Sequence, residues 1–155
     1  MDQIIIRKAS LNDLDTLLCF EQALMDSDRS FDNTIKAEAN YYDIEKMITA
    51  SNVEIVVAEL NDEIIGSGFA RIENSKPYLK HQSHAYLGFM YVDPNHRGKG
   101  VSKKIIEALK RWAISQNVNE MQLRVYHDNL TAIKAYEKVG FIKNILEMRI
   151  DLKED

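Results

Sequence analysis

The sequence predicts an α/β (α+β) domain, because apolar patterns of strand period and helix period alternate along almost the whole chain. Short alternating or apolar runs predict about six strands, and amphipathic patterns predict about four helices. Turn and capping residues separate these segments. The expected order is β-α-α-β-β-β-α-β-α-β, within a single domain over residues 1–155.

The N-terminal part is expected to form one strand and two helices. Ile4, Ile5 and Ile6 open the strand, and the polar run 10–13 provides capping residues for a helix over residues 11–26. Apolar residues recur at helical spacing inside this helix, with Glu21 among the inner positions. After a polar break, residues 34–50 show the same spacing and predict a second helix.

A β-hairpin and a central strand are expected next. Residues 53–60 and 63–73 flank Asn61-Asp62, a two-residue turn signal, and predict an antiparallel hairpin. Residues 84–92 are aromatic and apolar, which predicts a central strand. Gly88 inside this strand marks either a β-bulge or a position where another backbone packs closely.

The C-terminal part predicts a strand, a helix and a final strand. Residues 120–126 alternate apolar and polar side chains, and residues 129–139 form a helical pattern. Asn129 is a typical N-cap, and Gly140 is a typical end of a helix. Residues 141–152 are expected to form the strand that closes the sheet.

The segment 93–102, DPNHRGKGVS, joins the central strand to an amphipathic helical pattern. Gly98 and Gly100 allow the backbone to approach a ligand closely, and the unpaired N–H groups of a first helical turn bind anions. Arg97, Lys99 and Lys103 add positive charge. The spacing fits neither the Walker motif nor the dinucleotide-binding glycine motif. The segment therefore predicts a phosphate cradle of another kind.

Together, the cradle and the helix over 129–139 resemble the GNAT family of N-acetyltransferases. The family pattern Gln/Arg-x-x-Gly-x-Gly/Ala is met by Arg97 and Gly100, with Ser102 in place of the usual Gly or Ala. The resemblance is sharpest over residues 84–142. It implies the GNAT fold, a mixed, mostly antiparallel twisted central sheet of 6–7 strands flanked by about four helices.

The resemblance also implies an acetyl-CoA-dependent enzyme that acetylates a primary amine of a small molecule or peptide by direct attack. Tyr136 matches the general acid of the family. Backbone groups of Met90 and Val92 would pair with pantetheine, and the Met90 N–H would polarise the thioester carbonyl. The expected cofactor-binding residues are Met90, Val92, Arg97, Gly98, Lys99, Gly100, Val101, Ser102 and Asn129.

The residues alone leave alternatives open for several of these positions. Tyr136 shares a helical face with apolar residues and could be a core aromatic, while Asn129 could be only a helix cap. The central strand carries no carboxylate that would serve as general base, so His84, Tyr86, Glu21, Asp28 or ordered water are the candidates. Each of these side chains is more often structural or solvated than catalytic.

Two other functional classes also fit the motifs. The first alternative is a non-catalytic acyl-CoA-binding sensor with the same fold. The second is an unrelated module whose cradle binds a nucleotide, which predicts competition by ATP. Acidic residues concentrate between Phe20 and Glu45, which would attract a cationic amine acceptor, although solvated outer faces of two amphipathic helices are the more common explanation.

Composition limits the remaining partners. The chain has 155 residues and a formal net charge of −4, with no basic stripe for nucleic acid. Neither a leader nor an apolar run of about 20 residues is visible, so we expect a cytoplasmic location without membrane binding. The single cysteine, Cys19, is expected to be a buried thiol on the first helix. His81 and His84 are expected on opposite faces, without a metal, and a homodimer through a sheet edge is plausible.

Overall fold

The computed structural model describes residues 3–153 and contains two compact units. The first unit ends at Arg124, and the second begins at Val125. Each unit has its own internal packing. The expectation of a single domain stays a prediction.

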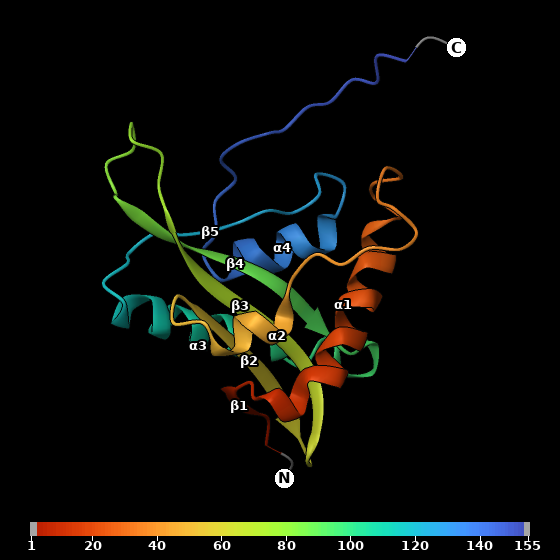
Figure 1. Cartoon of the computed structure of the whole chain (residues 1–155), viewed down its shortest axis with the longest axis vertical. Coiled ribbons are helices and arrows are strands. Elements are labelled where there is room, and N and C mark those ends of the chain that lie inside the picture. Colours follow the sequence, from red (N-terminus) through yellow and green to blue (C-terminus); the bar gives the residue numbers. More distant parts are fainter. Residues whose placement is uncertain (1–2, 154–155) are drawn as a thin grey trace. The chain divides into compact units, whose positions relative to one another are not determined.

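The first unit is built on a five-stranded sheet with the order β1-β2-β3-β4-β5 (Figure 1). The sheet is mixed, because three neighbouring pairs are antiparallel and only β4 with β5 is parallel. This confirms the predicted mixed, mostly antiparallel sheet, although it has fewer strands than expected. The strands are β1 Ile5–Lys8, β2 Val53–Leu60, β3 Glu63–Asn74, β4 Ser83–Val92 and β5 Met121–Leu123.

The predicted hairpin is confirmed in β2 and β3. Leu60 pairs with Glu63, so Asn61 and Asp62 form the two-residue turn between them. Both turn residues have positive φ angles, 51° and 65°. Such a turn follows the right-handed twist of the flanking strands, and Asn and Asp tolerate this backbone region well.

Helices cover both faces of the sheet in the first unit (Figure 1). On one face lies α3, Val101–Ser115, which buries apolar side chains such as Ile105 and Leu109. On the other face lie α1, Leu14–Asp28, and α2, Ile44–Thr49. The core on the second face contains Ala9, Leu17, Phe20, Ile44, Ile48, Val53, Ile55, Val57, Phe69 and Phe89.

The helix predicted over residues 34–50 is wrong for most of its length. Only α2 is helical, and residues 34–43 contain turns and irregular backbone. Side chains of α1 and of its C-cap, Arg29, bind the backbone of residues 34–43, which we call the α1–α2 connection. Arg29 donates to the carbonyls of Lys36 and Ala37 at 2.6–3.0 Å, so these carbonyls are satisfied outside a helix.

The predicted position of Cys19 is also wrong, because its side chain is exposed. Leu17, Phe20 and Glu21 occupy the inner side of α1, and Cys19 falls on the outer side of the same helix. Within residues 3–153, no helix is both long and apolar enough to cross a membrane.

The second unit contains the predicted helix as α4, Leu130–Lys138. Asn129 caps it by accepting a hydrogen bond from the N–H of Ala132 at 3.3 Å, and Gly140 follows with φ 107°. The strand predicted over 141–152 is not formed, because residues 141–153 lie outside any helix or strand. The strand predicted over 120–126 is limited to β5. The missing last strand accounts for the five strands observed in place of six.

Candidate functional site

The cradle lies between the end of β4 and the start of α3. The chain leaves β4 at Val92 and makes a short 3-10 turn, η2 Pro94–His96, in which the Asp93 carboxylate accepts from the N–H of Asn95 at 2.9 Å. The Arg97 Nε then donates to the Val92 carbonyl at 3.1 Å. These two contacts fix the path of the chain into the glycines.

Gly98 and Gly100 both adopt left-handed backbone, with φ 79° and 78°. A Cβ atom built at either position would meet no atom within 4 Å, so the space beside the backbone is open. Gly100 is the N-cap of α3, and the first intrahelical bond is donated by Lys104 to its carbonyl at 3.2 Å. The N–H groups of residues 101–103, in the first turn of α3, therefore have no acceptor within the helix.

Charge at this helix end is positive. The first turn of α3 contains no acidic residue, and Arg97, Lys99 and Lys103 are exposed around it. Val101 is buried and anchors the helix to the sheet, whereas Ser102 is partly exposed. Open backbone donors, a helix N-terminus and three cations together suit a phosphate or pyrophosphate group.

A β-bulge interrupts β4 next to the cradle. Ser67 pairs with Tyr91 and Phe69 pairs with Gly88, so two residues of β4, Phe89 and Met90, face one residue of β3. Phe89 has φ 56°, and its carbonyl accepts from the buried Ser67 hydroxyl at 3.1 Å. The bulge predicted at Gly88 is therefore present one residue later.

Gly88 is required here for a second reason. A Cβ atom at this position would lie 2.7 Å from Cζ of Phe69, whose ring packs directly over the strand. The bulge expected from Gly88 is therefore present, whereas the close neighbour is the Phe69 side chain and not another backbone. Beyond this glycine, β4 also leaves the parallel ladder, since β5 pairs only with Ala85 to Leu87. Met90 and Val92 lie on the part of β4 past that ladder.

Aromatic side chains cover the bulge on the α1 face of the sheet. The ring of Tyr42 lies 5.1 Å from that of Phe69, at 89°, and 5.7 Å from that of Phe89. Burial raises the pKa of Tyr42, the nearby Tyr86 raises it further, and a hydrogen bond from the Phe89 backbone opposes the rise. Tyr42 is therefore a neutral phenol at the bulge.

The carboxyl group of Glu21 fixes the position of Tyr42 beside the bulge. Glu21 is fully buried, and its Oε2 accepts from the N–H groups of Tyr41 and Tyr42 at 3.0 and 2.9 Å. The Asn40 amide, with its nitrogen toward Glu21, lies 3.2 Å from Oε1. Glu21 was a candidate base, but these contacts give it a structural role. The sequence did contain a signal for this structural role, because an acidic residue on the inner side of an amphipathic helix must find hydrogen-bond partners.

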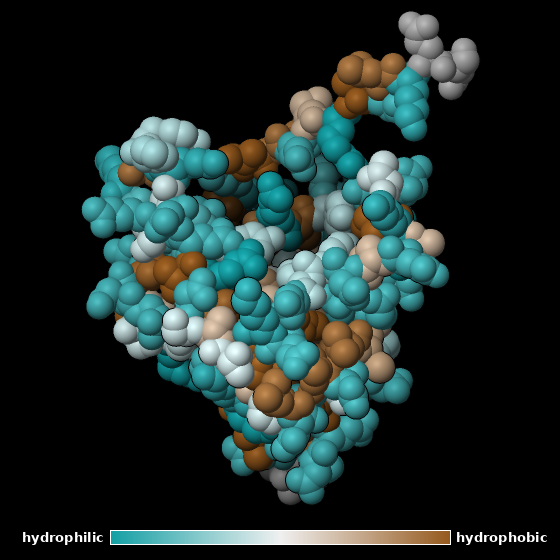
Figure 2. All heavy atoms as spheres, viewed as in Figure 1, coloured by the Kyte–Doolittle hydropathy of each residue, from teal (hydrophilic) through white to brown (hydrophobic). Residues whose placement is uncertain are grey.

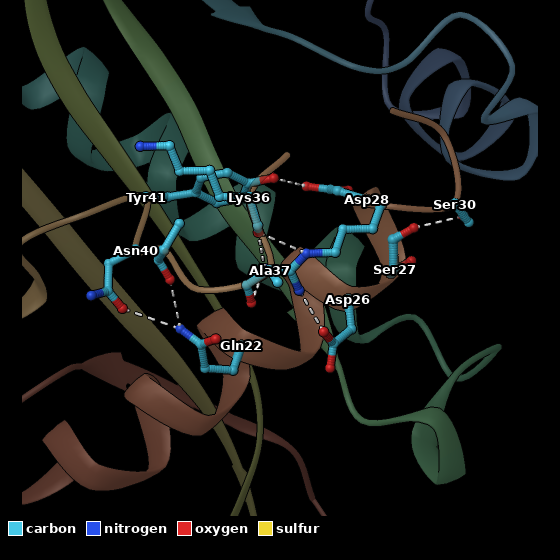
Figure 3. A network of polar contacts seen from close by, with 11 residues as sticks. Gln22, Asp26, Ser27, Asp28, Ser30, Lys36, Ala37, Asn40 and Tyr41 are labelled. Carbon is cyan, nitrogen blue, oxygen red and sulfur yellow. Dashed lines mark hydrogen bonds and ion pairs between the residues drawn. The ribbon is translucent and has the colours of Figure 1, made fainter. Parts of the chain in front are cut away.

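Further polar contacts bind the α1–α2 connection to α1 (Figure 3). Gln22 donates to the Ala39 carbonyl at 3.1 Å, and the Tyr41 hydroxyl donates to Asp28 at 2.8 Å. Burial raises the pKa of Asp28, and the bond from Tyr41 opposes that effect. Asp28 and the exposed Tyr41 therefore form a polar pair next to Tyr42, whose ring lies 5.7 Å from that of Tyr41.

His84, another candidate base, lies at the opposite end of β4 and has partners of its own. Its Nδ1 lies 2.9 Å from the Ser75 hydroxyl, and its Nε2 lies 3.3 Å from Glu73. Its ring also meets that of His81 at 6.2 Å, so the prediction that these rings point apart is wrong. His81 precedes β4, where the alternation of a strand does not apply.

Arg71 makes cation–π contacts with the rings of Phe69 and Tyr86. The Arg71 guanidinium lies 5.4 Å from the ring centre of Phe69 and 5.6 Å from that of Tyr86. Burial raises the pKa of Tyr86, and the nearby cations Arg124 and Arg71 oppose the rise. Tyr86 is therefore a neutral phenol, which is a poor proton acceptor at neutral pH.

Asn129 and Tyr136 belong to the second unit. Asn129 serves as the N-cap of α4, which agrees with the simpler of its two interpretations. Tyr136 is half-buried on α4, and its ring meets that of Phe141 edge to face at 5.9 Å. The roles of both residues toward a ligand stay predictions.

The mixed sheet and the cradle define an α/β protein with an anion-binding loop at a helix N-terminus, and comparison with known proteins gives the family. The model of the acetyltransferase (GNAT) family matches residues 20–141. The chain therefore belongs to the GNAT family of acetyltransferases, and the resemblance seen in the sequence is confirmed.

An acetyltransferase of Pectobacterium atrosepticum is 31% identical over 99 residues, which is 64% of this chain and 64% of that protein. The match thus covers less than two thirds of this relative. A mutant form of the BH1408 protein from Bacillus halodurans superposes with a TM-score of 0.86 at 18% identity, over 96% of this chain and 99% of that one. The aminoglycoside N-acetyltransferase AAC(6')-Iy, solved with CoA, gives 0.74 at 21% identity, over 99% and 96%.

Proposed function

We propose that the protein transfers an acetyl group from acetyl-CoA to a primary amine of a small molecule or peptide. The observation that carries this proposal is the cradle, in which two open left-handed glycines precede the N-terminus of α3 beside three exposed cations. Family membership supports the acetyl group as the one transferred. The CoA complex of AAC(6')-Iy, which shares the fold, supports CoA as its carrier.

The donor would lie along the part of β4 beyond Gly88. The pyrophosphate would bind the N–H groups around Gly98 to Ser102, with Arg97 and Lys99 balancing its charge. The backbone of Met90 and Val92 lies past the ladder with β5, so it can pair with the pantetheine amides as an added strand does. The N–H of Met90 would polarise the thioester carbonyl. CoA supplies the thiolate leaving group.

The acceptor amine must lose a proton before it attacks, because an aliphatic amine with a pKa of ~10.4 is mostly protonated at neutral pH. Neither Glu21 nor Tyr42 is a free base at the bulge, since Glu21 is bound to backbone and Tyr42 has a raised pKa. We therefore assign the proton removal to water, and the protonation of the departing thiolate to Tyr136. Asp28 with Tyr41 would attract a cationic acceptor.

Thermal unfolding in parallel with acetyl-CoA, CoA and ATP tests this proposal. A ligand at ~100 times its Kd adds about 2.7 kcal/mol to the free energy of unfolding. We expect both CoA species to raise Tm, and ATP to leave it unchanged. A shift with ATP alone would instead support a nucleotide module. Release of free thiol from acetyl-CoA with polyamines, aminoglycosides or peptides then separates an enzyme from a non-catalytic acyl-CoA sensor.

A further inference from the structure

One cation near the end of β5 has no counter-ion. Arg124 comes directly after this strand, one residue past the last pair of the ladder between β4 and β5, Leu87 with Leu123. Its side chain is exposed, and within residues 3–153 no carboxylate lies at ion-pair distance from its guanidinium. Arg124 belongs to the first unit, as β4 and α1 do. It therefore lies where the ladder ends and the part of β4 assigned to the donor begins.

The side chain of Arg124 lies beside Tyr86 on the α1 face of the sheet. Tyr86 packs against the core of that face and pairs with Gln122, and Arg124 follows Gln122 by two residues, the spacing that returns a side chain to the same face. Burial raises the pKa of the Tyr86 phenol, and the charges of Arg124 and Arg71 oppose the rise. In the described part of the chain nothing binds the Tyr86 hydroxyl by a hydrogen bond, so this neutral donor can bind a ligand.

The net positive charge beside Tyr86 is that of Arg124. Arg71 is already paired, since its Nε and Nη2 atoms lie 2.9 and 2.8 Å from Oε2 of Glu73. Glu73 thus balances Arg71 and holds it against the Tyr86 ring. One guanidinium and one hydroxyl remain for a ligand. They match a singly charged carboxylate better than a phosphate group, which carries close to two charges.

Negative charge lies near the same aromatic side chains. Asp28 accepts from the Tyr41 hydroxyl at 2.8 Å (Figure 3), and no cationic side chain among the described residues forms an ion pair with it. Burial raises the pKa of the Tyr42 phenol, and the nearby Tyr86 and Asp28 raise it further. The Tyr42 hydroxyl is therefore close to both Asp28 and Tyr86. Two phenols thus connect an unpaired carboxylate with the unpaired Arg124.

The surface on this side of the first unit suits a polar ligand. In Figure 2, hydrophilic side chains prevail on the face that carries α1, and apolar groups form separate patches. A polyamine would be attracted by Asp28 but repelled by Arg124. An apolar amine would leave both charges without a partner. An amine that also carries a carboxylate satisfies both charges.

We propose that the acceptor is an amino acid or a similar small amine with a carboxylate, whose ammonium group is attracted by Asp28 and whose carboxylate binds Arg124 and the Tyr86 hydroxyl. This proposal rests on the acetyl transfer proposed above. The neutral amine forms the C–N bond as the C–S bond of acetyl-CoA breaks. Of the two protons that the ammonium group loses, one goes to water and the other ends on the CoA thiolate. The carboxylate is unchanged.

Matched amines test the class of acceptor in the natural protein with acetyl-CoA. The members of each pair differ only by a carboxylate: glycine and methylamine, β-alanine and ethylamine, 4-aminobutyrate and propylamine, and lysine and cadaverine. We expect kcat/KM of at least one carboxylated amine to exceed that of its partner about tenfold or more, through a lower KM. If no pair shows this preference, the proposal is wrong.

Substitutions assign the preference to Arg124. Arg124→Gln should raise the KM of the preferred carboxylated amine about tenfold while kcat and the Kd for acetyl-CoA stay within about twofold, and Arg124→Lys should restore part of the loss. Arg111→Gln removes an exposed cation from α3, on the opposite face of the sheet, and is the matched control. Asp28→Asn should raise the KM of both members of a pair alike, so the preference for the carboxylate is kept.

The outcomes separate this proposal from the proposed function. Failure of the natural protein to bind acetyl-CoA in calorimetry would overturn acetyl transfer, and the acceptor with it. A protein that binds acetyl-CoA but keeps its carboxylate preference in Arg124→Gln would contradict the acceptor site alone. A weaker Kd for acetyl-CoA in that variant would place Arg124 at the donor and also overturn the proposal.

Discussion

Glu21 on α1 accepts a hydrogen bond at 2.9 Å from the backbone N–H of Tyr42, a residue of the α1–α2 connection, and Glu21 is fully buried. The same carboxyl oxygen binds the N–H of Tyr41 at 3.0 Å. This contact determines where the Tyr42 ring lies, because the backbone of residues 41 and 42 has no helix or strand to fix it. The buried carboxyl group of Glu21 thereby connects α1 to Tyr42, whose ring packs against the β4 bulge.

Glu21→Ala is expected to lower the free energy of unfolding by about 2–4 kcal/mol, because it leaves two buried N–H groups without an acceptor. Glu21→Gln should cost about 1 kcal/mol, since its amide oxygen can accept both bonds. Urea unfolding measures the difference. Glu45→Ala, at an exposed position of α2, is the control and should change stability by less than about 0.5 kcal/mol. Equal losses for Ala and Gln at position 21 would contradict the assigned role.

Gly88→Ala should destabilise the protein by about 1–3 kcal/mol, because the new methyl group would lie 2.7 Å from the Phe69 ring. The cost arises from steric overlap and not from backbone strain. A smaller side chain at position 69 should therefore relieve it. In a double-mutant cycle, Gly88→Ala is expected to cost clearly less in a Phe69→Leu background than in the natural protein. Additive costs would show that the overlap is absorbed elsewhere.

The stability contributed by Asp13 should depend on pH. Its carboxylate accepts from Arg7 at 2.8 and 3.0 Å and from the N–H of Ser10 at 2.8 Å, and the bond from Arg7 is the main cause that lowers its pKa. A lowered folded-state pKa means that the contribution is complete above the unfolded value of about 3.9 and disappears as pH falls through the folded one.

Asp13→Asn should therefore cost about 1–3 kcal/mol at pH 7 and progressively less below about pH 4. Unfolding curves of both proteins at several pH values measure this difference. Asp15→Asn, on the exposed outer side of α1, is the control and should show little effect at any pH. A difference that is constant from pH 7 to pH 3 would indicate lost packing and not lost charge pairing.

Local patterns predicted the parts of the fold whose causes are local. The hairpin follows from Asn61-Asp62, which tolerate the left-handed backbone that the turn requires. The cradle follows from Gly98 and Gly100 placed directly before an amphipathic helix. In each case the residues that specify the structure are adjacent in the chain.

The parts that sequence reasoning missed depend on distant contacts. Residues 34–43 have helical spacing, but Glu21, Gln22 and Arg29 bind the N–H and C=O groups that a helix would have used internally. The strand expected over 141–152 is not formed, because its pairing would depend on residues distant in the chain that no local pattern specifies. The role of Glu21 required knowledge of residues about 20 positions further along.

Gly100→Val should abolish acetyl-CoA binding, because its side chain fills the open space beside the backbone and disfavours the left-handed conformation at φ 78°. Gly100→Asn separates the two effects, since Asn tolerates this conformation but still fills the space. Both variants should lose at least about tenfold in affinity by calorimetry, equivalent to about 1.4 kcal/mol.

Gly140→Asn is the matched control for the cradle, because Gly140 also has a positive φ and open space around its Cβ position. Its affinity for acetyl-CoA should be unchanged. If folded Gly100→Asn binds as tightly as the natural protein, the pyrophosphate does not lie against Gly100.

Tyr136→Phe should lower kcat by about 10²-fold or more while leaving the Kd for acetyl-CoA within about twofold, because it removes a proton donor and almost no contact area. The edge-to-face contact with Phe141 needs only the ring and is kept in the variant, and circular dichroism checks that the variant is folded. Tyr78→Phe makes the same chemical change at a side chain that is 83% exposed and should leave kcat unchanged. Turnover of Tyr136→Phe equal to that of the natural protein across the pH range would exclude Tyr136 as the acid and leave solvent to protonate the thiolate.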